Sequence, residues 1–539
     1  MKTLGRFSMA LCLLLGATAN AGAASGGPTQ SELDQAREST STWLMTNKSY
    51  DGHRYVSLDQ INRHNAAQLQ EVCVFDSQVS AQAQSTPLLY AGRIYFTVGA
   101  TTIAVDATNC KQLWRHEWVV KGKALSLVNR GPAIKDGVLV RGTPDGYLIA
   151  LSMADGSLLW QRQITSAQES HYLSMPAMIV EDRIIYGTAG ADWGGRGWIG
   201  AFKLSDGTEI WRYEALPTPG GPGSESWGSA EALAHGGASY WTPVVVDRAR
   251  KLVFVASGNP APDFFGEARA GDNAGTNSAV ALDLETGKPL WVKQFVAHDT
   301  HDWDLDQVGP LVSTSFQGKK RNLLIVSGKD GRMRIVDRDT YEVLSDLAIS
   351  KQENAAAAAT VQGVHICPGL LGGQEWSSSS FDPKEGIVIA PMVDWCGTVH
   401  HDPSAPVHAV GAHFYGGGID QDPIEQARGL LAAVDVGSGT LRWKSEAPAP
   451  MLGNVTATSG GIVFAGDLKG TLYAVDSHDG SVLLRYPLGA SVGGGLFTYA
   501  LGGRQYVAAV SGPVSAFFGG GSGTARLTVL ALPQKVSAR

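Results

Sequence analysis

Carboxylates and imidazoles are concentrated in one short stretch of the chain, Ala297–Pro310, with the sequence AHDTHDWDLDQVGP. Six such residues lie within nine positions: His298, Asp299, His301, Asp302, Asp304 and Asp306. Carboxylates this close repel one another unless a positive charge lies among them or water solvates them. The stretch is therefore either a solvated acidic loop or part of a cation site, and the rest of the chain must decide between these two interpretations.

Two other stretches offer oxygen ligands for the same ion. Asp192 lies in GTAGADWGGRG (187–197), whose glycines let the backbone approach a ligand closely, although a Gly-rich hairpin would have the same composition. Asn259 lies in ASGNPAP (256–262), where Asn before Pro also commonly begins an ordinary turn.

Asp304 and Asp306 are separated by one residue, so on an extended chain both carboxylates point to the same side. An all-oxygen set suits a hard cation such as calcium better than zinc or copper. We expect His298, Asp299, His301 and Asp302 to be supports rather than metal ligands. The predicted metal ligands are Asp192, Asn259, Asp304 and Asp306.

A repeated motif predicts the scaffold that positions these residues. It consists of a small residue, an apolar residue, Asp or a substitute, a Gly-containing turn and a Trp, and each copy is typical of two strands joined by a tight turn. The clear copies are Ala104–Trp114, Ala150–Trp160, Ala201–Trp211, Ala281–Trp291 and Ala433–Trp443, with weaker ones at Ile335–Leu344 and Ala474–Leu484.

About four short strands in every ~45 residues indicate an all-β propeller. The intervals Trp211–Trp291 and Leu344–Trp443 are about twice as long as the others, and Val244–Gly258 and Phe381–Pro391 have the pattern of the missing hairpins. Seven or eight blades fit, and we expect an eight-bladed β-propeller with docked Trp side chains. The Gly- and Pro-rich segment Pro217–Gly237 is expected to be a long loop.

The first 24 residues have the pattern of a cleaved export signal. Lys2 and Arg6 precede the short apolar run Met9–Leu15, and small residues follow at 17–24. No later segment approaches about 18 uninterrupted apolar residues, so no membrane span is expected. We therefore expect an exported protein with one domain, residues 25–539. The net charge of −7 argues against a nucleic-acid partner.

Four cysteines remain after residue 24, namely Cys73, Cys110, Cys367 and Cys396. An even number in an exported protein indicates two disulfides, and three pairings are possible. Proximity in the sequence favours Cys73–Cys110 and Cys367–Cys396. The chain contains no C-x-x-C-H motif for covalent haem attachment.

Taken in order along the chain, these stretches resemble the pyrroloquinoline-quinone (PQQ) dependent alcohol dehydrogenases, periplasmic quinoproteins related to methanol and ethanol dehydrogenase. The resemblance covers nearly the whole mature chain. It is carried by Trp43–Asn47 with Tyr50–Asn62, VNRGPA (128–133), GTAGADWGGRG, SGNPAP, HDWDLD, SGKDGRMRIVDR (327–338), CPGLLGGQEW (367–376) and GGRQYV (502–507).

The resemblance implies roles for individual residues. Asp304 corresponds to the catalytic base and Lys329 to the cation beside the reactive carbonyl of the quinone, while Trp241 corresponds to the floor under its ring. Asp306 falls where lanthanide-using members carry an extra carboxylate. The implied cofactor-binding positions are Arg130, Thr143, Ser174, Ala189, Gly190, Ala191, Trp241, Lys329 and Glu375.

The chain departs from the family pattern in several places. The adjacent cysteine pair of many members is missing from Gly122–Asn129, and Asp192 stands where Glu is usual. Met451 and Leu452 stand where a Trp is common. The Cys367–Cys396 pair does fit the nonvicinal disulfide of the family.

The implied activity is oxidation of an alcohol by PQQ with a bound calcium or lanthanide ion. Electrons would pass to a separate soluble cytochrome c, since the chain has no haem motif. Two alternatives remain at this point. One is a quinoprotein for sugars or for bulky or polymeric secondary alcohols, and the other is a non-enzymatic propeller scaffold.

Overall fold

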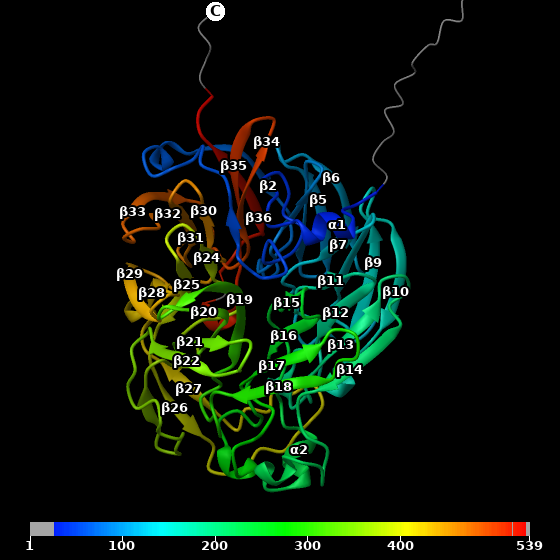
Figure 1. Ribbon diagram of the computed structural model, residues 1–539. Helices are drawn as coiled ribbons and strands as arrows, with labels where there is room; N and C mark the ends of the chain where they lie inside the picture. The colour runs from blue at the N-terminus through cyan, green and yellow to red at the C-terminus, as the bar shows by residue number, and fades with distance from the viewer. Residues whose placement is uncertain (1–25, 520, 535–539) are drawn as a thin grey trace, which may run out of the picture.

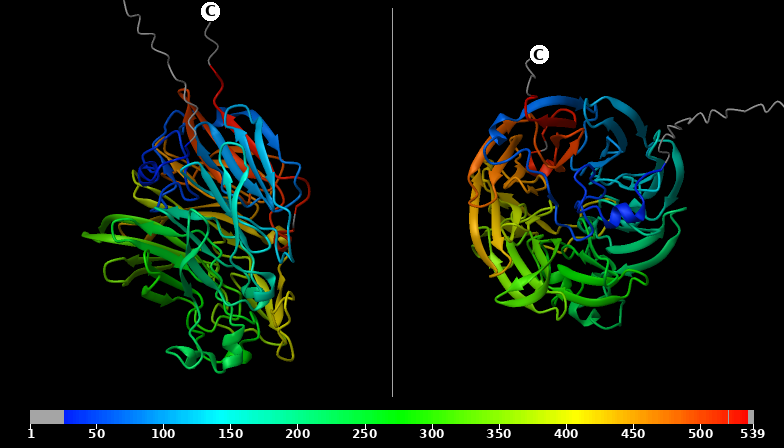
Figure 2. Two further views of the ribbon diagram at one scale, coloured as in Figure 1. Left: turned by 90° about the vertical axis from the view of Figure 1, so that its right-hand side faces the viewer. Right: turned by 45° about the horizontal axis from the view of Figure 1, so that its top comes forward.

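The structure is a computed structural model that describes residues 26–519 and 521–534. The predicted export signal, residues 1–24, lies outside the described residues. Strands provide most of the regular structure, and the α-helices α1 (Gln30–Asp34) and α2 (Ala230–Ala234) are short. The sheets follow one another around a common axis (Figures 1 and 2). The expected all-β propeller fold is present.

Five consecutive four-stranded sheets form the first part of the ring, and within each of them neighbouring strands pair antiparallel. Their strands are β3 (Leu88–Tyr90), β4 (Arg93–Val98), β5 (Thr101–Asp106), β6 (Gln112–Glu117); β7 (Ala133–Lys135), β8 (Val138–Gly142), β9 (Tyr147–Ser152), β10 (Leu158–Gln163); β11 (Met178–Val180), β12 (Arg183–Gly187), β13 (Trp198–Lys203), β14 (Glu209–Glu214); β15 (Val245–Asp247), β16 (Leu252–Ala256), β17 (Ser278–Asp283), β18 (Pro289–Gln294); and β19 (Leu305–Phe316), β20 (Lys319–Gly328), β21 (Arg332–Asp337), β22 (Val343–Ala348).

Three further sheets continue the ring, and a smaller three-stranded sheet branches from it. The three are β24 (Ser380–Asp382), β25 (Ile387–Asp394), β28 (Arg428–Asp435), β29 (Thr440–Ala447); β1 (Tyr55–Val56), β30 (Thr456–Thr458), β31 (Ile462–Gly466), β32 (Thr471–Asp476), β33 (Val482–Pro487); and β2 (Gln70–Asp76), β36 (Arg526–Ala531), β35 (Arg504–Ser511), β34 (Leu496–Leu501). The smaller sheet consists of β23 (Val364–Ile366), β26 (Gly397–His401) and β27 (Gly417–Gln421).

Strands from the two ends of the chain pair in one sheet. β2 lies antiparallel to β36, with Cys73 opposite Val529. Cys73 is also bonded to Cys110, which follows β5 in the next sheet along the chain. The pairing of β2 with β36 closes the ring (Figure 2), and the disulfide links this sheet to the next one along the chain.

The repeated Trp side chains each contact the following sheet. The indole N–H of Trp114 donates to the Met153 carbonyl at 3.1 Å, and that of Trp211 donates to the Leu284 carbonyl at 3.0 Å. Gly156 and Gly287 fit against these indole rings, where an added Cβ would lie 2.5 Å and 2.4 Å away. Trp160 and Trp443 donate to the following repeats in the same way.

The long intervals between Trp residues have different origins. Both predicted hairpins are present, as β15–β16 and β24–β25. The second long interval also contains the additional sheet β23–β26–β27, which the sequence did not predict. The expected loop Pro217–Gly237 contains α2, because Ser229 caps the helix by accepting the N–H of Ala232. Among the described residues, no helix is long and apolar enough to cross a membrane.

Candidate active site

The residues expected to do chemistry lie where strands of successive sheets end. Asp192, in the 3₁₀ helix η3 (Ala191–Trp193), follows β12; Asn259 follows β16; and Lys329 follows β20. Asp304 directly precedes β19, which pairs with β20. β12, β16 and β20 occupy the same place in successive sheets, so the loops that follow them converge at one end of the ring.

These loops enclose a cavity with a volume of about 210 Å³. The predicted residues that line it are Arg130, Ala189, Gly190, Ala191, Asp192, Trp241, Asn259, Asp304, Lys329 and Glu375. Tyr172, Trp193, Asp302 and Trp376 complete its polar and aromatic walls. One site therefore gathers side chains from distant parts of the sequence, from Gln82 to Phe518.

Asp304 is held by a cation and by two backbone groups. Its carboxylate lies 2.7 Å from the Lys329 ammonium, and its Oδ1 accepts the Asn259 N–H at 3.0 Å. The Lys329 N–H donates to the Asp304 carbonyl at 3.0 Å. Gly258 makes this approach possible, because a Cβ there would lie 2.1 Å from Oδ1 of Asp304. The two charged groups are buried, so little water weakens their attraction.

The carboxyl groups around this ion pair have shifted pKa values. Burial, followed by the negative charge of Asp304, raises the pKa of Asp192 to about 6 and that of Asp306 well above its usual range. Burial also raises the pKa of Glu375 to about 7, although Lys329 opposes the shift. Burial lowers the pKa of Lys329, but the surrounding carboxylates outweigh it, and the net shift is upward. Such a site favours a bound cation, which would stabilise the ionised carboxylates.

Arg130 and two indoles form one side of the cavity. The Arg130 guanidinium lies 4.4 Å from the centre of the Trp241 ring and 5.3 Å from that of Trp376. The Lys329 ammonium lies 5.9 Å from the Trp241 ring. A flat aromatic face with two adjacent cations suits a planar ligand that carries carboxylates.

Three predicted site residues do not line the cavity. The hydroxyl of Thr143 donates a hydrogen bond to the carboxylate of Asp145 at 2.6 Å, so its donor is already used within the same turn. Ser174 and Asp306 are buried outside the lining, and their side-chain oxygens have no hydrogen-bond partner. Contacts of these three residues with a cofactor or metal stay predictions.

Asp302 and Asp263 are functional candidates that the sequence did not single out. We expected Asp302 to be a support, but it lines the cavity and lies 3.2 Å from the Lys329 ammonium. Asp263 is completely buried, four positions after Asn259, and neither of its carboxylate oxygens has a partner. Asp299 is a support, because it accepts the N–H groups of His301 and Trp303, each at 2.8 Å.

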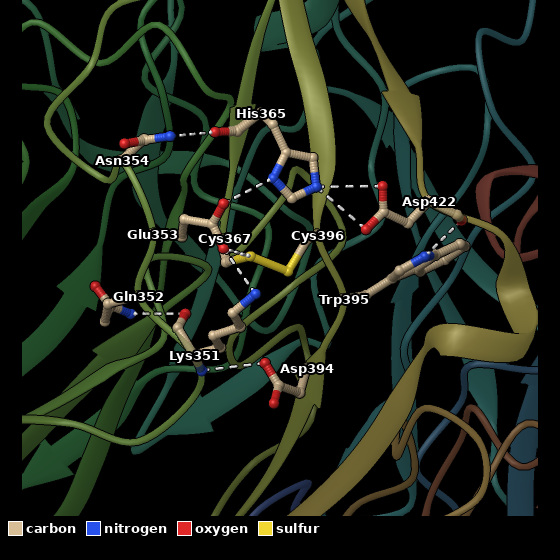
Figure 3. Close-up of a disulfide and its surroundings, with 10 residues drawn as sticks. All are labelled: Lys351, Gln352, Glu353, Asn354, His365, Cys367, Asp394, Trp395, Cys396 and Asp422. Carbon is tan, nitrogen blue, oxygen red and sulfur yellow. Dashed lines mark hydrogen bonds and ion pairs between the residues drawn. A yellow bond between two sulfur atoms is a disulfide. The ribbon is translucent and has the colours of Figure 1, made fainter.

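The disulfide Cys367–Cys396 anchors the segment that covers the cavity. Figure 3 shows it beside His365, whose two ring nitrogens contact Glu353 and Asp422. It ties the end of β23 to the residue preceding β26, and the chain runs from it directly to Glu375. Both disulfides predicted from sequence proximity are thus present.

The buried polar atoms without hydrogen-bond partners among the described residues fit the two groups that the sequence implied, a hard cation and PQQ. Asn259 Oδ1, both Asp306 oxygens and Glu375 Oε1 lack partners, and so do Nε and Nη1 of Arg130. Buried polar atoms are rarely left unpaired in native proteins. The oxygens of Asn259, Asp306 and Glu375 are ligands of the kind that a hard cation prefers. The guanidinium of Arg130 beside the indole rings suits an anionic planar cofactor.

Comparisons with known proteins agree with this site. The profile of the glucose/ethanol/alcohol dehydrogenase PQQ β-propeller family matches residues 43–351, and that of the outer membrane protein assembly factor BamB matches residues 427–525. The quinoprotein alcohol dehydrogenase PedH of Pseudomonas putida is 27% identical, over 93% of this chain and 91% of its own. A lanthanide-dependent methanol dehydrogenase of Methylacidiphilum fumariolicum is 26% identical, over 94% and 90%.

Solved structures show the same fold. A europium-containing methanol dehydrogenase superposes with a TM-score of 0.85 at 24% identity, covering 93% of this chain and 100% of the other. The quinohemoprotein alcohol dehydrogenase ADHIIG of Pseudomonas putida superposes with a TM-score of 0.86 at 24% identity, covering 94% and 83%. Since the family profile spans more than half of the sequence, the chain belongs to the PQQ-dependent glucose/ethanol/alcohol dehydrogenase family of β-propeller proteins.

Proposed function

We propose that this protein is a periplasmic quinoprotein that oxidises alcohol groups to carbonyls. The observation that carries the proposal is the buried Asp304–Lys329 pair, 2.7 Å apart, on the wall of a cavity lined by Asp192, Asn259 and Trp241. PQQ, when bound, supplies the two-electron oxidant, and a calcium or lanthanide ion supplies a Lewis acid for its reactive carbonyl.

The side chains of the cavity divide the remaining work. Asp304 would accept the proton of the alcohol hydroxyl, and the Lys329 ammonium, 2.7 Å away, holds its carboxylate in place. Arg130 and Lys329, which both lie beside the Trp241 ring, would hold the negatively charged cofactor, and Trp241 would offer its ring an aromatic surface. Leu370 and Phe518 also line the cavity and limit the access of water.

The proposed cation ligands are Asp192, Asn259 and Asp304, with Asp306 as a fourth. The first three line the cavity. Asp306 lies deeper, and the charges that act on it include those of Glu375 and Arg130. Thr143 and Ser174 keep a proposed role as buried supports of the cofactor site.

We further propose that the protein is one domain, residues 25–539, preceded by a cleaved export signal. Each of the eight sheets with four or more strands would form one blade, docked to the next through the Trp side chains. The electrons would leave one at a time to a separate soluble cytochrome c, since the sequence has no C-x-x-C-H motif.

A second apolar cavity favours bulky alcohols among the possible substrates. Its volume is about 150 Å³, and it shares Asp302, Leu370, Leu371 and Phe517 with the main cavity. Phe264 and Ile419 form its far wall. A bulky group attached to the carbinol carbon could occupy this space while the hydroxyl faces Asp304.

The test is reconstitution of the purified protein with PQQ and, in turn, calcium and several lanthanides. Dye reduction should depend on an alcohol, on PQQ and on at least one of the metals. No activity with any metal across small, bulky and sugar alcohols would contradict the enzymatic proposal. Failure to bind PQQ as well would favour the scaffold alternative.

A further inference from the structure

We propose that Asp263 and Asp302 are additional ligands of the cation beside Asp192, and that these added carboxylates favour a trivalent over a divalent metal. This inference rests on the proposed function, because it concerns the same ion. It adds Asp263, a residue with no assigned role.

The geometry of the three side chains fits a single hard ion. One carboxylate oxygen from each of Asp192, Asp263 and Asp302 can be chosen so that all three lie within 4.8 Å of one another. Calcium-sized ions lie about 2.4 Å from their oxygen ligands, so two oxygens on one ion are at most about 4.8 Å apart. The spacing of the three oxygens is thus compatible with one shared ion.

Asp263 is a buried carboxyl group without a hydrogen-bond partner among the described residues. Arg269 lies close, but its guanidinium donates to the carbonyls of Pro262, Asp263 and Asp299 and to the side chain of Asn273. An isolated buried carboxylate is strongly unfavourable, which makes a cation the partner that the site lacks.

The charges around the cavity favour a high-valent ion. Carboxyl groups outnumber the cationic side chains that act on them, which are Arg130, Arg269 and Lys329. The carboxyl groups are Asp192, Asp263, Asp302, Asp304, Asp306 and Glu375. A trivalent ion balances this excess better than calcium does, because each further ligand charge raises its affinity more.

Two backbone contacts hold the ligands in place. Arg269 bonds to the carbonyls of Asp263 and Asp299 and so ties the Asp263 loop to the stretch that carries Asp302. The Phe414 N–H donates to the Asp192 carbonyl at 2.7 Å, which fixes the third ligand from the loop between β26 and β27. Asp192 is shorter than the usual Glu, and Asp263 supplies a carboxylate from the opposite loop.

The experiment measures metal binding directly, in the full mature chain freed of metal by chelation. Terbium is titrated, and its luminescence is excited through tryptophan, since Trp193 and Trp303 are the sequence neighbours of two proposed ligands. The variants are Asp263→Asn and Asp302→Asn. The control is Glu267→Gln, which changes a carboxylate four positions after Asp263 whose side chain is 63% exposed.

We expect each Asp→Asn variant to bind terbium about 10-fold more weakly or worse, and to reduce the preference for terbium over calcium. Luminescence lifetimes in H₂O and D₂O should show about one more bound water in each variant, because water replaces the lost carboxylate. Glu267→Gln should match the wild type. Thermal unfolding without metal checks folding, and Asp263→Asn should not lower the midpoint, since the carboxyl group that it replaces makes no hydrogen bond with the described residues.

Wild-type affinity and hydration in Asp263→Asn would overturn the proposal, as would an equal loss in Glu267→Gln. If Asp263→Asn does not fold, Asp302→Asn provides the same two readouts. Terbium binding needs neither PQQ nor alcohol. A negative terbium result for the variants therefore does not contradict the enzymatic proposal. Likewise, absence of alcohol oxidation does not affect the result of the metal titration.

Discussion

The ammonium of Lys329 lies 2.7 Å from the carboxylate of Asp304, and both side chains are at least nine-tenths buried. The pair is fixed by its backbone as well, because the Lys329 N–H donates to the Asp304 carbonyl. A base that must stay ionised in a dry site needs such a partner.

Replacing Asp304 by Asn should reduce kcat by about 10²–10⁴-fold, the usual contribution of a general base. Asn keeps the shape and can still accept the Asn259 N–H, so the fold should persist. The measurement is steady-state dye reduction, with PQQ binding followed by tryptophan fluorescence. Retained turnover with normal cofactor binding would show that another group is the base.

Replacing Lys329 by Met leaves several carboxyl groups without their buried cation. Removing one partner of a buried ion pair costs about 3–5 kcal/mol, so the midpoint of thermal unfolding should fall clearly at pH 7. The loss should shrink at lower pH, because burial raises the pKa of Asp302 and its protonated form no longer needs the cation. Lys329→Arg, which keeps the charge, is the control, and equal destabilisation by both variants would contradict this explanation.

Replacing Arg130 by Gln should weaken PQQ binding more than it changes turnover at saturating PQQ. The guanidinium lies 4.4 Å from the centre of the Trp241 ring, and two of its nitrogens have no hydrogen-bond partner among the described residues. Its loss removes about 1.5–3 kcal/mol of charged hydrogen bonding, or roughly 10- to 150-fold in Kd. Fluorescence titration with PQQ measures the effect, and Arg130→Lys should restore part of the affinity.

Sequence alone predicted the residues whose role is carried by a local pattern. Asp304, Asn259 and Lys329 each lie directly before or shortly after a strand of the repeat. The propeller places these strand ends at one end of the ring and so brings the three residues together. Asp263 was missed because three residues, two of them prolines, separate it from Asn259, and only the folded chain shows that it lies close to Asp192. Thr143 was assigned to the cofactor from resemblance, yet Asp145, two positions later, takes its hydroxyl.

The fold could be predicted because its signal is repetitive. Each Trp motif corresponds to one pair of strands, and its indole contacts the next repeat. The repeat can therefore be recognised even where a single copy, such as Ile335–Leu344, lacks the Trp. The sheet β23–β26–β27 has no such period and depends on long-range contacts, including Cys367–Cys396 and the pairing of Val364 with Val399. Tertiary contacts of this kind leave no local pattern to detect.

His171 should make the protein less stable in mild acid. Burial lowers the pKa of this imidazole to about 4, and its ring nitrogens contact the Thr165 hydroxyl and the Arg196 carbonyl. In the unfolded chain the pKa of the His171 imidazole is about 6.5, so in mild acid it binds a proton that it does not bind in the folded protein. The contribution of neutral His171 to the free energy of unfolding is therefore complete above about pH 6.5. It is lost as the pH falls toward 4, and the loss is at most about 3 kcal/mol.

The measurement for His171 is the unfolding free energy at intervals between pH 7 and pH 4. His171→Gln can still bond to Arg196 but does not titrate, so its stability should fall less over this range than that of the wild type. Parallel curves for the two proteins would show that the imidazole is already protonated in the folded state, or that other groups dominate the acid sensitivity.

Filling the second cavity should separate bulky from small alcohols. Leu371 lies on the wall shared by the two cavities, and a Trp at this position would occupy the apolar space in front of Phe264 and Ile419. Leu371→Trp should lower kcat/KM for an aromatic alcohol by about 10-fold or more, whereas ethanol should change by less than about threefold. Leu290→Trp on β18, where the residue is 58% exposed, is the matched control. If both alcohols lose equally, the substitution has disturbed the cofactor site, and the second cavity has no part in choosing the substrate.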